Sequence, residues 1–183
     1  IAAGELLRKR LSDQAQRCKV LEHITMPDWS VLHEAYGRHR AIILAAAHVG
    51  PPKAAMHCVA GLSMPTMIWT NKQDLPDWLV EASGASFLDP TSPSERPTML
   101  VNAALHLRNH GVLMGAPDIA TGRKQVVIER FGTPLIFSLG IPALVKQLEI
   151  PVFLVLALWK GCRLRLQYEL IASPPTDLRD DDW

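Results

Sequence analysis

Short apolar runs that alternate with helix-like segments are the feature that most constrains the fold of this chain. The predicted strands are Ala41–Ala47, Pro65–Thr70, Ala85–Leu88, Val112–Ala116, Gln125–Ile128, Val152–Leu158 and Leu164–Leu170. The predicted helices are Trp29–His39, Pro51–Leu62, Leu75–Ser83, Pro97–Asn109 and Leu139–Leu148. Strands that alternate with helices predict an α/β fold, with a mostly parallel sheet and helices on both of its faces. We expect a single domain of this kind.

Three parts of the chain differ in pattern. Residues 1–40 have loose helical spacing of apolar residues and read as a helical N-terminal segment. Residues 41–172 hold the α/β pattern, and its last two strands flank a turn at Lys160-Gly161, which predicts an antiparallel hairpin at one edge of the sheet. Residues 173–183, rich in Pro and Asp, predict a loose C-terminal tail.

The composition supports a packed core and argues against a nucleic-acid partner. Of 183 residues, 48% are hydrophobic and 20% are charged, which is typical of a globular protein. The formal net charge of +1 gives no basic field that would attract nucleic acid. The three cysteines form no C-x-x-C pair, so we expect reduced, buried thiols in a cytoplasmic protein.

Membrane contact is expected to be peripheral at most. No segment has the roughly 20 consecutive apolar residues that a spanning helix needs. Residues 1–40 do form a basic amphipathic segment, with Arg8, Lys9, Arg10, Arg17 and Lys19 between apolar residues. This favours the solvated face of a packing helix, and contact with the inner face of a membrane stays open as the alternative.

Polar residues follow several of the predicted strands, where a ligand site is expected. His48, Asn71, Asp89 and Asp118 come directly after four of them or within two residues of their ends. In an open α/β sheet, ligands bind beyond the carboxyl ends of the strands. We therefore expect one histidine and two carboxylates to converge at one edge, where a histidine held by a carboxylate can act as a general base.

The order of several short motifs resembles the lysophospholipid acyltransferase superfamily, and most closely its bacterial lipid A lauroyl/myristoyl acyltransferase branch. The resemblance rests on five segments: AIILAAAHVG at 41–50, LRNHGVLMGAPD at 107–118, FGTP at 131–134, GIPA at 140–143 and IPVFL at 150–154. In that superfamily a buried strand delivers a catalytic histidine, and an acid follows five residues later. The resemblance covers about Ala41 to Leu170.

The resemblance implies transfer of an acyl group from a thioester to a hydroxyl or amine. The co-substrate would be acyl-coenzyme A or the phosphopantetheine thioester of an acyl carrier protein, with no bound cofactor and no metal. His48 would be the base, and backbone N–H groups near Gly50 or Gly132 would stabilise the oxyanion. Asn71 and Asp89 are further candidates for substrate contacts. Phosphate groups would need cations, for which the candidates are Arg123, Lys124 and Arg130.

One position departs from the motif, because Lys53 stands where the superfamily has its acid. An ammonium group cannot orient the imidazole and would disfavour its charged form. Three alternatives stay open. Another carboxylate orients His48, with Asp118 the first choice and Asp89 or Glu129 after it. Or Lys53 binds an anionic group of the substrate beside a weaker base. Or catalysis is lost and the chain binds an acyl chain or a partner protein. A thioester hydrolase is a further alternative.

His106 and His110 have the i, i+4 spacing that suits two metal ligands on a helix. The segment lacks the glutamate of the zinc protease motif, so we expect two helix-surface histidines and no metal site.

Overall fold

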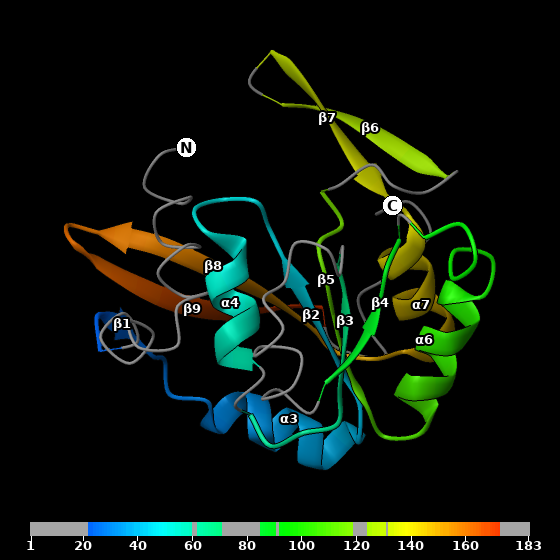
Figure 1. The fold of residues 1–183 in the computed structure, drawn as a ribbon, viewed down its shortest axis with the longest axis horizontal. Helices are drawn as coiled ribbons and strands as arrows, with labels where there is room; N and C mark the ends of the chain where they lie inside the picture. Colours follow the sequence, from blue (N-terminus) through cyan, green and yellow to red (C-terminus); the bar gives the residue numbers. More distant parts are fainter. Residues whose placement is uncertain are drawn as a thin grey trace.

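A seven-stranded, mostly parallel sheet organises the protein in the computed structural model, which describes residues 22–59, 62–70, 85–90, 92–118, 124–130 and 132–172. The strand order is β1-β9-β8-β2-β5-β3-β4 (Figure 1). Its strands are β1 Ile24–Thr25, β2 Ile42–Ala46, β3 Thr66–Trp69, β4 Ser86–Leu88, β5 Val112–Gly115, β8 Val152–Lys160 and β9 Arg163–Ala172. The helices between them are α3 Ser30–His39, α4 Pro52–Val59, α6 Met99–Arg108 and α7 Gly140–Leu148. The predicted α/β class and mostly parallel sheet are confirmed.

The central strand β2 is buried on both faces, because helices cover each side of the sheet. Ile42 and Leu44 point into one apolar cluster, with side chains of α3 and α4. Ile43 and Ala45 point into a second cluster, with side chains of α6 and α7. Figure 1 shows α4 on one side of the sheet and α6 and α7 on the other. A strand with both faces buried is apolar throughout, which is why its sequence shows no alternation.

The start of the described chain differs from the helical segment expected over residues 1–40. Ile24 and Thr25 form β1, which pairs in parallel with Leu164 and Arg165 of β9. Pro27 then intervenes before α3, whose bounds agree closely with the prediction. The other expectations for residues 1–21, for a helix over 75–83 and for the tail 173–183 lie outside the described residues.

The antiparallel pairing of β8 with β9 is confirmed, with the turn at Gly161, whose φ is +62°. Because β1 lies beyond β9, this hairpin is next to the edge of the sheet and does not form it. Cys162 lies in the same turn as a free, exposed thiol. The expectation that the cysteines are buried is therefore wrong for Cys162, because a two-residue turn leaves no core to enclose it.

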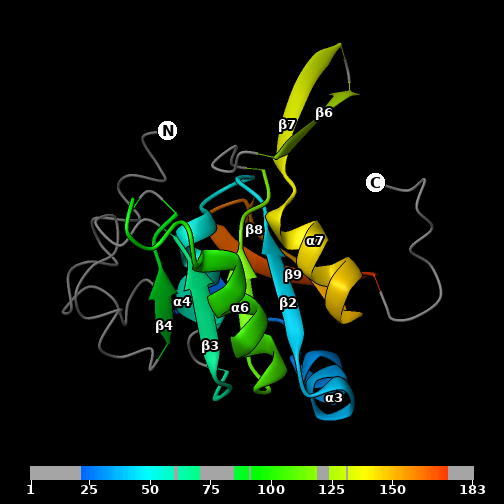
Figure 2. The ribbon, with the colours of Figure 1, turned by 90° about the vertical axis from the view of Figure 1, so that its right-hand side faces the viewer.

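A separate two-stranded antiparallel sheet was only half predicted. Its strands are β6 Gln125–Arg130 and β7 Thr133–Ser138. The sequence predicts β6 in shorter form and does not predict β7, because Pro134 interrupts the run. Proline is tolerated there since both strands of a lone hairpin are edge strands. Figures 1 and 2 show this hairpin projecting from the body at the edge where β2 and β5 end.

The helices of the described residues are short. None of them is long and apolar enough to cross a membrane.

Candidate functional site

The site is built where two neighbouring parallel strands end. Strands β2 and β5 pair in parallel, with Ala45 opposite Gly115. His48 and Asp118 each follow this pair by three positions, so the pairing delivers both residues to the same edge of the sheet. Adjacent strands lie only about 4.8 Å apart, which is within reach of these two side chains.

Asp118 binds His48 through both oxygens of its carboxylate. Its Oδ2 accepts the backbone N–H of His48 at 2.6 Å, and its Oδ1 lies 2.9 Å from Nδ1 of the imidazole. A carboxylate accepts hydrogen bonds, so Nδ1 is the nitrogen that carries hydrogen. The other ring nitrogen, Nε2, then has a lone pair that is free to take a proton. This is the arrangement of a histidine general base with its orienting acid.

The pair is accessible from solvent. The His48 side chain is 42% exposed and the Asp118 side chain 25% exposed. The carboxylate is therefore the more enclosed member and the imidazole the more open one. A substrate can approach the imidazole without displacing a helix or strand of the described structure.

Gly50 holds the loop after His48 against the neighbouring strand β8. Its φ is +74°, and a Cβ at this position would lie 2.0 Å from the carbonyl oxygen of Ala157. Only glycine allows both the left-handed backbone and this close approach. The loop then enters α4 through Pro51 and Pro52, which have no N–H. Val49 and Gly50 therefore carry the only backbone N–H groups between His48 and Lys53.

Trp69 lies at the end of β3, beside β5. The sequence analysis does not predict that it packs at the same edge of the sheet as His48 and Asp118. A Cβ at Gly115 or at Gly140 would lie 3.4 Å from atoms of its side chain. Its indole nitrogen is buried and has no hydrogen-bond partner among the described residues. The two glycines, which let the ring pack closely, are the signal in the sequence that points to it.

Asp89 does not join the His48–Asp118 pair, so the expectation that two carboxylates converge there is met by only one. Asp89 follows β4, three strands away from β2, which corresponds to about 14 Å. It is buried, and its backbone N–H donates to Oε2 of Glu95 at 2.8 Å. The sequence places it at the correct edge but cannot give the order of the strands.

Arg130 and Gly132 lie at the tip of the β6–β7 hairpin and not beside His48. Six residues of β6 separate this tip from the body, a length of about 20 Å. Gly132 has φ +69°, and a Cβ there would meet nothing within 4 Å. Glu129 also lies on this hairpin, opposite Pro134. This placement puts Gly132 and Arg130 away from His48, because the chain continues into strand β7, which the sequence does not predict. Their oxyanion and phosphate roles stay predictions.

Three further candidates lie wholly or partly outside the described residues. Asn71 and Arg123 lie outside the described residues. Lys53 belongs to the first turn of α4, and its side chain is likewise outside the described part.

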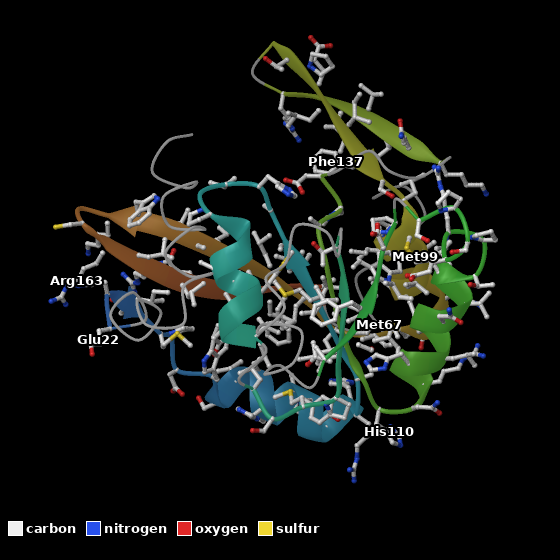
Figure 3. All side chains as sticks on the ribbon, in the orientation of Figure 1. Glu22, Met67, Met99, His110, Phe137 and Arg163 are labelled. Atoms are coloured by element: carbon white, nitrogen blue, oxygen red, sulfur yellow. The ribbon has the colours of Figure 1, made fainter. Side chains whose placement is uncertain are left out.

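His106 and His110 belong to the opposite end of the sheet. Nε2 of His106 lies 3.2 Å from the Pro65 carbonyl oxygen and 3.1 Å from that of Val112, so this ring holds the segments that enter β3 and β5. Figure 3 shows His110 at this end, far from Phe137 of the hairpin. Within the ranges that the structure describes, no three His, Cys, Asp or Glu side chains are grouped to hold a metal ion.

A comparison of the sequence with protein-family models gave no match, and a comparison with curated proteins gave no significant match. The resemblance to the lysophospholipid acyltransferase superfamily therefore stays a prediction.

Proposed function

We propose that this protein is an acyltransferase that moves an acyl group from a thioester to a hydroxyl or amine, with His48 as general base and Asp118 as the acid that orients it. The observation that carries the proposal is the double hydrogen bond from the Asp118 carboxylate to the amide and imidazole of His48, at 2.6 and 2.9 Å. The order of motifs along residues 41–170 supplies the reaction class by resemblance.

In the proposed reaction, Nε2 of His48 removes the proton of the acceptor hydroxyl or amine. The acceptor oxygen or nitrogen attacks the thioester carbonyl, and the carbonyl oxygen becomes an oxyanion. The intermediate collapses by breaking the carbon–sulfur bond. The thiolate leaves and takes the proton back from the imidazolium. The products are the acylated acceptor and a free thiol, and no covalent intermediate on the enzyme is needed.

The oxyanion requires donors close to the base. Gly50 is the retained candidate, because it lies two residues after His48 and is fixed against Ala157. Its N–H and that of Val49 precede two prolines that can donate nothing. A single backbone donor of this kind lowers an acyl-transfer barrier by about 3 kcal/mol.

Asp118 can take the role of the acid that the superfamily has at the position of Lys53. The superfamily acid follows its histidine by five residues, whereas Asp118 reaches His48 from the loop after the neighbouring strand β5. The first of the three alternatives is thus the one we adopt. Under this proposal Lys53 takes no part in orienting His48 and stays the candidate to bind the anionic part of a donor, such as the phosphates of coenzyme A or of phosphopantetheine.

A thioester hydrolase is the second candidate, and one observation favours it. The His48 side chain is 42% exposed, so water can reach the same nitrogen that would activate an acceptor. The chemistry differs only in the nucleophile, and the products therefore distinguish the two.

The test is incubation of the full chain with acyl-coenzyme A or acyl carrier protein thioester and a panel of hydroxyl and amine acceptors, with products read by mass spectrometry. We expect an acylated acceptor with the wild type and a loss of about a hundredfold or more in rate with His48→Ala. The matched control is His110→Asn, an exposed histidine at the other end of the sheet. Equal rates for wild type and His48→Ala contradict the base assignment. Free fatty acid without an acylated acceptor supports the hydrolase.

A further inference from the structure

The β6–β7 hairpin, residues 125–138, exposes apolar side chains on both of its faces. Val127 and Ile136 form one cross-strand pair and are 62% and 44% exposed. Ile128 and Leu135 form the next pair and are 41% and 39% exposed. Neighbouring pairs in an antiparallel ladder point to opposite faces, so each face of the hairpin carries one exposed apolar pair beside its polar residues.

Nothing in the described sheet shields this surface. β6 and β7 pair with each other, and within the described strands neither joins the seven-stranded sheet. A lone two-stranded hairpin is only marginally stable in water, and apolar residues on both of its faces add surface that favours another environment. Figures 1 and 2 show the hairpin extending away from the body, and Figure 3 shows Phe137 where it joins the body.

The base of the hairpin is connected directly to the site. The backbone N–H of Ser138 donates to the carbonyl oxygen of Pro117 at 2.7 Å, and Pro117 precedes Asp118. The backbone N–H of Leu139 donates to the carbonyl oxygen of Lys124 at 3.2 Å. Whatever the hairpin contacts is therefore held on the same side of the molecule as the His48–Asp118 pair.

The apolar side chains on both faces of the hairpin and the cations at the ends of β6 indicate which surface the hairpin contacts. A flat protein surface can cover one face of a hairpin, whereas the interfacial layer of a lipid bilayer surrounds both. Exposed cations lie at the two ends of β6, Lys124 before it and Arg130 at the tip, against one exposed acid, Glu129. Such cations favour anionic lipid headgroups. The free edges of both strands exclude the hydrocarbon core, because their backbone groups need water or headgroups as partners.

We propose that the β6–β7 hairpin docks the protein on an anionic lipid surface, with its apolar pairs in the interfacial layer to a depth of about 5–10 Å. The docking does not depend on the reaction. Its consequence, delivery of the His48–Asp118 pair to a lipid acceptor, rests on the proposed acyl transfer.

The primary test is flotation of the full chain with vesicles of phosphatidylglycerol and phosphatidylcholine, compared with vesicles of phosphatidylcholine alone. The variant is Val127→Thr with Ile136→Thr, since threonine keeps the strand preference of these positions. We expect it to weaken binding by about tenfold, because two exposed apolar side chains become polar. The matched control is Leu170→Thr with Ile171→Thr, two exposed residues of β9, and it should bind as the wild type does.

A second double variant tests the contribution of the two cations to vesicle binding. Lys124→Gln with Arg130→Gln should lower binding to the phosphatidylglycerol vesicles by about fivefold for each charge and leave the weak binding to phosphatidylcholine unchanged. His48→Ala should float as the wild type does, so that a failure of the acyl-transfer proposal and a failure of docking give different results.

A measurement on the unmodified protein guards against variants that fold poorly. Amide hydrogen exchange with and without vesicles should show new protection confined to residues 124–138. Three results overturn the proposal: no flotation of the wild type, equal flotation of both threonine variants, or protection elsewhere on the surface. A wild type that is dimeric by light scattering and a hairpin variant that is monomeric also overturn it, since a second copy would then be the occupant.

Discussion

The carboxylate of Asp118 holds His48 by two atoms at once, the backbone N–H and Nδ1 of the ring. The first contact fixes where the chain lies and the second fixes how the imidazole is turned. A substitution at Asp118 therefore changes the position of the histidine as well as its tautomer.

Asp118→Asn should lower kcat by about a hundred- to ten-thousandfold. An amide has only one accepting oxygen, so it cannot accept the two hydrogen bonds of His48 at two separate oxygens as the carboxylate does. If its NH₂ group faces Nδ1, the ring must carry its hydrogen on Nε2 and loses its basic nitrogen. Steady-state kinetics with the thioester measure the effect, with KM little changed. Circular dichroism checks the fold, and an unchanged kcat would contradict the role of Asp118.

Gly50→Ala should cost far more stability than Gly132→Ala. Both glycines have positive φ, of +74° and +69°, so each substitution carries the left-handed penalty of about 1 kcal/mol. At Gly50 the new methyl group also meets the carbonyl oxygen of Ala157 at 2.0 Å, which adds about 1–3 kcal/mol of overpacking. Urea unfolding of the two variants measures the difference. Equal losses of unfolding free energy would show that the loop after His48 is not fixed against β8.

Glu149→Gly should raise the free energy of unfolding by about 1 kcal/mol. Glu149 ends α7 in the left-handed conformation, with φ +51° and ψ +49°, which glycine adopts without strain. Its negative charge also lies at the negative end of the helix dipole. Glu149→Gln removes the charge and keeps the strain, so it should recover only a small part of the gain. Thermal unfolding of both variants separates the two causes, and a destabilised glycine variant would contradict the assignment.

Stability should fall in acid through Asp28, at the start of α3. Its carboxylate accepts the backbone N–H of Ser30 at 3.0 Å and the Ser30 hydroxyl at 2.8 Å, and these bonds hold the pKa of Asp28 below its ordinary value of 3.8. A lowered pKa means that the contribution is complete above 3.8 and is lost as pH falls through the lowered pKa.

The measurement for Asp28 is the difference in unfolding free energy between wild type and Asp28→Ala as a function of pH. This difference should shrink on acidification. Ser30→Ala removes one of the two hydrogen bonds and should show a weaker pH dependence. A difference that does not vary with pH would contradict the assignment.

The sequence predicts most of the sheet, because its parallel strands are buried on both faces. The run from Ile42 to Ala46 and the run from Val112 to Gly115 are apolar at every position, and both were predicted as strands. The strands that the sequence does not predict, β1 and β7, lack this support. Thr25 and Pro134 are exposed residues of edge strands, where packing does not dictate composition.

The candidate site was predicted as a set of residues and not as a geometry. His48, Asp89 and Asp118 all follow strands, and that pattern places them at one edge. The pairing of β2 with β5, which decides that Asp118 and not Asp89 reaches His48, depends on long-range contacts. The sequence predicts Asp118 as the first choice to orient His48, but no local signal in it separates Asp118 from Asp89 by distance.

The central position of β2 has a consequence for dynamics. Three strands lie on each side of it, so its amides should be among the last to exchange with solvent deuterium, at rates set by global unfolding. The β6–β7 hairpin, anchored at its base, should exchange through local opening at a much smaller free energy. The end of β2, which carries His48, is thus expected to be rigid, whereas the adjacent β6–β7 hairpin is expected to open easily. We therefore expect His48 to keep its orientation even when the hairpin opens locally.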